Sequence, residues 1–272
     1  MELLGPITLF VCVYLATFLA AGYGAMAAGL PYHQCVALIS AICATAFTVR
    51  IIERAQWRVG IFVPPRFAAR DFLLGAAFAS VLILIADGLV MASTSLRQVH
   101  SGGFPALEML TIFIPAAVHE ELAFRGYLFQ KMRLWNRPAA IGITSCVFAL
   151  LHSNNRGISA LAIVNLVLAG VLLALAYERY ERLWFPIGIH LTWNVLSGPI
   201  LGYDVSGFVA TASVFRTVGA GPAWVTGGAF GIEGSVWMAV VELAGIACLT
   251  LNAEPRMKNE EFRRWGRWFS SF

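Results

Sequence analysis

Eight apolar stretches dominate this sequence of 272 residues, and they constrain its fold more than any other feature. An α-helix rises about 1.5 Å per residue, so about 20 apolar residues cross the roughly 30 Å hydrocarbon core of a bilayer. Most of the stretches approach or exceed that length, whereas the fifth and the seventh are short. They are residues 6–28, 34–52, 72–92, 106–130, 138–152, 158–177, 185–201 and 234–251.

The composition indicates a membrane protein rather than a soluble one. Hydrophobic residues make up 59% of the chain and charged residues 12%, whereas soluble domains carry about 25% charged residues. A chain with so few charged residues cannot cover a soluble core with polar, hydrated side chains. We therefore predict an all-α fold, a polytopic membrane helix bundle with about eight transmembrane helices.

The loops leave no room for a separate soluble domain, since the longest are residues 53–71, 93–105 and 202–233. We therefore predict a single integral-membrane domain over residues 1–272. The first stretch follows an acidic start without a basic segment, so we expect a retained span rather than a cleaved signal peptide. In residues 253–272 aromatic side chains alternate with arginines, which predicts an amphipathic cytoplasmic tail.

Basic residues sort to one side of this predicted bundle. Fifteen fall on the side of both termini, only Arg97, Arg156 and Arg216 fall on the other, and Arg125 lies inside a stretch. Because cytoplasmic loops carry the excess of Lys and Arg, we expect both termini in the cytoplasm. Seventeen arginines against two lysines favour a GC-rich bacterial source, hence a multi-pass protein of the bacterial inner membrane. The fifteen are Arg50, Arg54, Arg58, Arg66, Arg70, Lys131, Arg133, Arg137, Arg179, Arg182, Arg256, Lys258, Arg263, Arg264 and Arg267.

Two function classes are disfavoured. The net charge of +4 comes from arginines and lysines that lie mostly on one side of the predicted bundle and do not form a basic patch. This distribution argues against nucleic acid as a partner. The five cysteines lie in apolar stretches without CxxC spacing, so we expect neither a disulfide framework nor a structural zinc site.

The fourth stretch carries four ionisable residues close together: His119, Glu120, Glu121 and Arg125. Each charge near the bilayer centre costs about 2.5–3.5 kcal/mol, so the group needs a structural or chemical reason. Glu121 and Arg125 are four residues apart and can form a buried ion pair on one helix face. Glu120 points about 100° away and lacks such a partner, which makes it a candidate general base.

Two later stretches carry polar residues at the same helical spacing. Phe148 and His152 are four residues apart, as are His190 and Asn194. A lone histidine in a span is more often a hydrogen-bonded core residue than a catalyst, but the combination with a glutamate pair and an asparagine favours chemistry. A glutamate with a histidine can activate a water, and a histidine with an asparagine can donate hydrogen bonds to an oxyanion.

In this order on successive apolar segments, the residues resemble the CPBP family, which holds the CAAX-processing type II proteases and bacterial relatives linked to bacteriocin processing and self-immunity. The resemblance covers roughly residues 106–201, with a looser likeness over the glycine-rich residues 226–234. The three motifs are Glu120-Glu121-x-x-x-Arg125, Phe148-x-x-x-His152 and His190-x-x-x-Asn194.

The resemblance implies an intramembrane endopeptidase of the glutamic type, with its catalytic core at about residues 106–201. The first glutamate and the first histidine would activate the attacking water, and the second histidine and the asparagine would hold the oxyanion. The implied catalytic residues are Glu120, His152, His190 and Asn194, and the supporting residues are Glu121, Arg125 and Phe148. The implied partners are a peptide or membrane-protein substrate and the lipid bilayer.

We expect catalysis without a cofactor or a metal. The zinc-protease motif H-E-x-x-H begins at His119, but Ala123 stands where the second histidine would be. Three candidate ligands remain, namely Glu120, His152 and His190. Three protein ligands are enough for a catalytic zinc, so the ligand count alone does not exclude one.

Two alternatives stay open. A non-catalytic family member would serve immunity or scaffolding with the same fold. A transporter would use the buried carboxyl groups as a proton relay, although the sequence has no inverted repeat to favour it. Asp87, Glu108, Asn165 and Glu242 belong to no motif, and we expect them to form hydrogen bonds between helices.

Overall fold

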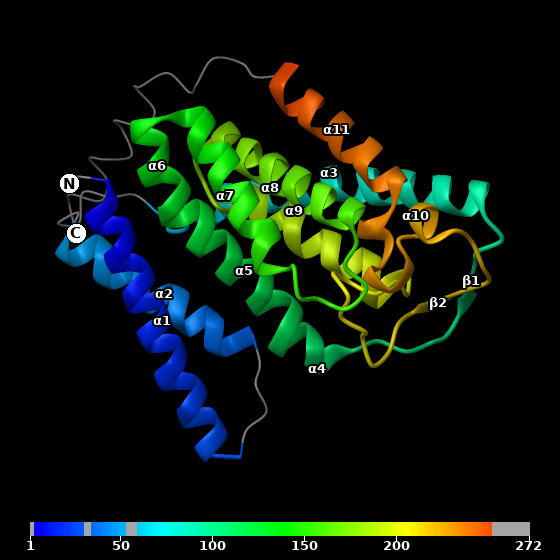
Figure 1. Ribbon diagram of the computed structural model, residues 1–272, viewed down its shortest axis with the longest axis horizontal. Coiled ribbons are helices and arrows are strands. Elements are labelled where there is room, and N and C mark those ends of the chain that lie inside the picture. The colour runs from blue at the N-terminus through cyan, green and yellow to red at the C-terminus, as the bar shows by residue number, and fades with distance from the viewer. Residues whose placement is uncertain (1–2, 30–33, 53–58, 252–272) are drawn as a thin grey trace.

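The computed structural model describes residues 3–29, 34–52 and 59–251, which are mostly helical (Figure 1). Eight helical units follow one another in these residues at the predicted places, so the predicted all-α membrane helix bundle is confirmed. Their bounds are α1 Leu4–Ala27, α2 Gln34–Ile51, α3 Pro65–Ser93, a run of α4 Ala106–Glu108, η1 Met109–Phe113, α5 Ile114–Ala123, η2 Phe124–Leu128 and α6 Phe129–Trp135, then α7 Arg137–Leu151, α8 Ala160–Tyr180, α9 Trp184–Val195 with η3 Leu196–Ile200, and α11 Val236–Leu251.

Four of these helices, α1, α2, α3 and α8, are long and apolar enough to cross a membrane, which indicates an integral membrane protein. Helices α7 and α11 are shorter apolar helices. The other two units contain π-helical turns, η1 and η2 in the run 106–135 and η3 after α9. Such turns occur frequently at functional sites. The predicted tail, residues 253–272, lies outside the described residues.

Helices α3 and α9 pack closely because two glycines remove side chains from their interface. A Cβ on Gly75 would lie 2.2 Å from the carbonyl oxygen of Phe185, and one on Gly188 would lie 2.3 Å from that of Phe72. Small residues allow membrane helices to approach in this way. The contact holds α9, which carries the third motif, against the long helix α3.

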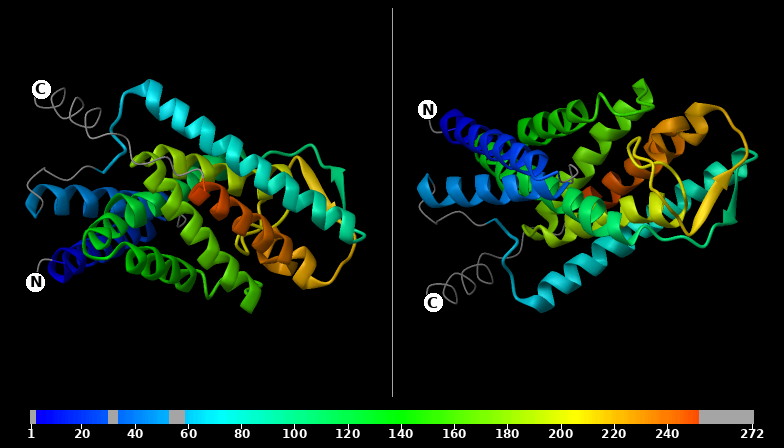
Figure 2. Two further views of the ribbon diagram at one scale, coloured as in Figure 1. Left: turned by 90° about the horizontal axis from the view of Figure 1, so that it is seen from above. Right: turned by 90° about the horizontal axis from the view of Figure 1, so that it is seen from below.

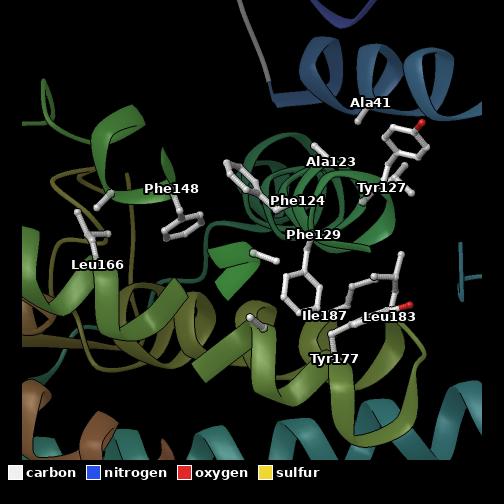
Figure 3. Close-up of a cluster of buried hydrophobic side chains, with 14 of the residues drawn as sticks. Ala41, Ala123, Phe124, Tyr127, Phe129, Phe148, Leu166, Tyr177, Leu183 and Ile187 are labelled. Carbon is white, nitrogen blue, oxygen red and sulfur yellow. The ribbon is translucent and has the colours of Figure 1, made fainter. Parts of the chain in front are cut away.

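A buried aromatic cluster fixes the run 106–135 against its neighbours. Figure 3 shows Phe124 and Phe129 of this run beside Phe148 of α7 and Tyr177 of α8. The rings of Phe124 and Phe148 meet edge to face with centroids 5.6 Å apart, and those of Phe129 and Tyr177 do so at 5.9 Å. Such pairs add about 0.5–1.5 kcal/mol beyond their buried area. The first and second motifs are thereby held in fixed relation.

The segments between helices form a small ordered layer at one end of the molecule (Figures 1 and 2). Strand β1, Arg97–His100, pairs antiparallel with β2, Phe215–Val218, at the end opposite to α1 and α2. Three single-turn helices follow, α10 Ala223–Thr226, η4 Gly228–Phe230 and η5 Ile232–Gly234. The sequence indicated only loops there.

The hydrogen bonds between membrane helices that the sequence predicts for the four polar residues outside the motifs are not found among the described residues. Three of these residues bond to the connecting segments, whose positions helix periodicity cannot predict. The contacts run from Gln98 and Tyr203 to Asp87, from the backbone of Thr211 to Glu108, and from Asn165 to the carbonyl oxygens of Glu233 and Ser235. The fourth residue, Glu242, has a buried Oε2 without a hydrogen-bond partner among the described residues.

Candidate active site

One cavity of about 160 Å³ brings together side chains of all three motifs. It lies among α5, α7, α8 and α9, close to the end of the molecule that carries the connecting segments. Among its lining residues are all four predicted catalytic residues, Glu120, His152, His190 and Asn194, together with Phe148. These residues come from α5, from the C-terminal cap of α7 and from α9, so the bundle brings together groups that are far apart in the sequence.

Glu121 and Arg125 form the ion pair that their spacing predicts. Arg125 Nη1 donates to Glu121 Oε1 at 2.9 Å, and both side chains are fully buried. Arg125 Nη2 also donates to the carbonyl oxygen of Gly170 at 3.0 Å, which ties the pair to α8. The guanidinium carbon lies 5.4 Å from the centroid of the Phe148 ring, a cation–π contact. The pair therefore joins three helices beside the cavity.

His190 bonds to the same carboxyl group, a contact that the sequence did not indicate. Its Nδ1 lies 2.9 Å from Glu121 Oε1, and its Nε2 lies 3.8 Å from Glu120 Oε2. A carboxylate held by Arg125 accepts hydrogen bonds, so Nδ1 of His190 carries a proton. To donate to an oxyanion through Nε2, the ring must carry a second proton, and the two glutamates stabilise that charged form.

His152 lies one residue beyond α7, at its C-terminal cap. Its Nδ1 is 2.8 Å from the carbonyl oxygen of Phe148. A carbonyl oxygen only accepts hydrogen bonds, so Nδ1 carries the proton and Nε2 of the neutral ring has the free lone pair. The Phe148 ring packs against His152 with centroids 4.8 Å apart. The second motif therefore fixes both the tautomer and the orientation of His152.

Glu120 differs from Glu121 in lining the cavity, whereas both carboxyl groups have a buried Oε2 without a hydrogen-bond partner among the described residues. Glu120 Oε2 forms no hydrogen bond to a described residue, although His190 Nε2 is 3.8 Å away. An unsatisfied buried polar group costs about 1–3 kcal/mol, and such groups are few in folded proteins. Because Glu120 borders the cavity, a water or a substrate group there can satisfy this oxygen.

Metal ligation gains no support from the arrangement of donor groups. Within residues 3–29, 34–52 and 59–251, no three His, Cys, Asp or Glu side chains are grouped so that they could hold a metal ion. His119 points Nδ1 to the carbonyl oxygen of Pro115, 3.1 Å away, within its own helix. Metal-free catalysis stays a prediction.

Glu233 and Ser206 are among the lining residues of the cavity that belong to none of the three motifs. Glu233 lies in η5, in a loop that folds back on itself at its glycines. Gly231 has φ of +95°, and a Cβ there would lie 1.8 Å from the carbonyl oxygen of Asp204. A glutamate within a glycine-rich loop was the available sequence signal. This signal does not specify where the loop lies relative to the helices, so the sequence alone could not place Glu233 at the cavity.

Residues 102–196 match the family model described as Type II CAAX prenyl endopeptidase Rce1-like, and this segment contains all three motifs. A stretch of 93 residues is 34% identical to the "Uncharacterized 24.3 kDa protein" of Escherichia coli, covering 33% of this chain and 42% of that protein. The chain thus aligns with less than half the length of this relative. No solved structure matches the chain. The family match confirms, for residues 102–196, the resemblance to the CPBP family that the three motifs indicate.

Proposed function

We propose that this protein is an intramembrane endopeptidase that hydrolyses peptide bonds of membrane-associated peptides or proteins. One observation carries the proposal: Glu120, His152, His190 and Asn194 line a single cavity although they come from α5, the C-terminal cap of α7 and α9. The match of the surrounding segment to a protease family supports the same reaction class. Neither requires a cofactor, and we propose none.

In the proposed mechanism, Glu120 and His152 activate a water in the cavity. The free oxygen of Glu120 takes a proton from the water, and the free Nε2 of His152 accepts a hydrogen bond from it. The water oxygen then attacks the scissile carbonyl carbon. General base catalysis of this kind contributes typically about 10²–10⁴-fold to a rate.

His190 and Asn194 hold the oxyanion that forms during this attack. They are four residues apart on α9, so both side chains reach the cavity from one helix face. Glu121 and Arg125 support the site from behind, since Glu121 fixes the His190 ring and Arg125 fixes Glu121. Phe148 packs beside both histidines, with its ring centroid 6.3 Å from that of His190.

The proposed setting is a bacterial inner membrane with both termini in the cytoplasm. In that orientation the end of α7, and with it His152, lies toward the outer side. Reporter fusions at residues 135 and 215 are expected to report opposite sides, with residue 135 cytoplasmic. The same side for both would contradict the orientation.

The proposed activity is tested by comparing new protein ends in the membrane proteomes of cells that carry either the intact protein or Glu120→Gln. Glu178→Gln is the matched control, because Glu178 pairs with the exposed Arg137 and neither residue lines the cavity. We expect cleavage products with the intact protein and with Glu178→Gln, but not with Glu120→Gln. Identical products in all three would reject Glu120 as the base, and no products from any of them would favour the non-catalytic alternative.

A further inference from the structure

A second carboxyl group, that of Glu233, borders the cavity from outside the three motifs. Glu233 is 8% exposed and lies in η5, ahead of α11. It falls outside the matched segment 102–196, and the mechanism above leaves it without a role. Among the described residues, Glu120 and Glu233 are the carboxyl-bearing residues that line the cavity.

The hydrogen bonds of Glu233 leave one oxygen available. Its Oε2 accepts the backbone N–H of Ser206 at 2.5 Å and the hydroxyl of the same residue at 2.7 Å. Both bonds use Oε2, so a proton on this carboxyl group belongs on Oε1. Because Glu233 lines the cavity, a proton on Oε1 is within reach of a group bound there.

The two carboxyl groups have different environments. Burial raises the pKa of Glu233 above its ordinary value, while the two Ser206 donors lessen the rise. Glu120 instead has His190 Nε2 at 3.8 Å, a cationic partner whenever that ring carries two protons. Two carboxyl groups in unlike surroundings are a frequent basis for a division into acid and base.

We propose that Glu233 is the general acid that protonates the leaving amine, a role that rests on the proposed peptide hydrolysis. Glu120 takes a proton from the water as the water oxygen bonds to the carbonyl carbon. When the C–N bond breaks, the nitrogen takes the proton of Glu233 Oε1 and leaves as an amine. Water that refills the cavity returns a proton from Glu120 to Glu233, so atoms and charges balance over one turnover.

Ser206 is the positioning residue for this acid. It has φ of +47°, an uncommon value for a residue other than glycine, and this turn presents both of its donors to Glu233. Asn155 holds the turn by donating to the Ser206 carbonyl oxygen at 2.8 Å. At the other end, Asn165 donates to the carbonyl oxygen of Glu233 at 2.7 Å. The loop therefore holds the carboxyl group from both sides.

The test compares two substrates that differ only in the leaving group. One is the peptide around the bond found in the proteome comparison, and the other has a thioester in place of the scissile amide. A thiol ionises near pH 8.5, so it leaves as a thiolate without an acid, whereas an amine must be protonated. Purified full-length protein in liposomes is assayed as the wild type, Glu233→Gln, Glu120→Gln and the control Glu178→Gln.

We expect Glu233→Gln to lower kcat for the amide by about 10²–10⁴-fold with KM nearly unchanged, and kcat for the thioester by less than about tenfold. Glutamine keeps an oxygen that accepts from Ser206, so the loop remains in place. Glu120→Gln should slow both substrates, because both need an activated water.

Equal slowing of both substrates by Glu233→Gln, or no slowing of either, would overturn the acid role while leaving the proposed function intact. If the folded wild type cleaved neither substrate, the proposed function would fail and the acid role with it.

Discussion

Two polar clusters meet at the candidate site, and they differ in whether their side chains pair with one another or face the cavity without such a pair. In the closed cluster, Glu121, Arg125 and His190 bond to one another inside the helices. In the open cluster, Glu120, His152 and Glu233 line the cavity, and Glu120 Oε2 has no hydrogen-bond partner among the described residues. Glu120 and Glu121 are neighbours in the sequence, yet a 100° turn of the helix places them in different clusters. In the proposed mechanism, the ion pair of Glu121 and Arg125 supports the fold and orients His190, whereas Glu120 and His152 of the open cluster activate the water.

The strongest test of this division is to remove the free carboxylate. Glu120→Gln and His152→Ala should each lower cleavage by about 10²–10⁴-fold, since each removes part of the base that activates the water. The protein should stay in the membrane at wild-type amounts, because neither residue holds the helices together. Cleavage assays normalised by immunoblot measure both quantities. Full activity of Glu120→Gln would end its assignment as the base.

Breaking the closed cluster should affect stability instead. Arg125→Ala leaves the Glu121 carboxylate buried without its cation, and removing one partner of a buried pair costs about 3–5 kcal/mol. Glu121→Gln should act in the same direction. We expect both variants to unfold at lower denaturant concentration and to be less abundant in the membrane.

Arg137→Ala is the control for the closed cluster. Its ion pair with Glu178 leaves the arginine side chain 49% exposed, and exposed pairs contribute about 0–1 kcal/mol. Equal destabilisation by Arg125→Ala and Arg137→Ala would show that the buried pair has no special structural role.

Asn194 tests the oxyanion site, since it lies on the same helix as His190 and lines the cavity, whereas His190 also bonds to Glu121. Asn194→Ala should slow turnover by roughly 10²–10³-fold, the usual loss on removing one oxyanion donor. KM should change little, because the oxyanion exists only in the transition state. A raised KM with unchanged kcat would make Asn194 a substrate-binding residue.

The smallest expected effect is that of a chelator. The proposed mechanism takes its base from Glu120 and its oxyanion donors from His190 and Asn194. In the described residues, no three His, Cys, Asp or Glu side chains are grouped so that they could hold a metal ion. Cleavage by purified protein should therefore persist in strong chelators. If a chelator abolished activity and added zinc restored it, the histidines would have to be assigned as metal ligands.

Much of this arrangement could be predicted from local spacing. Helical periodicity placed the eight units, and the i, i+4 rule predicted the pair of Glu121 and Arg125. The bond from His190 to Glu121 could not be predicted, because it joins residues 69 positions apart and depends on how α5 and α9 pack. The position of the loop bearing Glu233 could not be predicted either, because its glycine-rich sequence has no periodicity that fixes its position.

The central claim is that water activated at Glu120 cleaves a peptide bond. It is tested most directly by following cleavage of the substrate peptide by purified protein in H₂¹⁸O within a single turnover. The account predicts one ¹⁸O atom in the new carboxyl terminus with the wild type and with Glu178→Gln, and no product above background with Glu120→Gln. No cleavage by the folded wild type, or equal labelled product from Glu120→Gln, would contradict it.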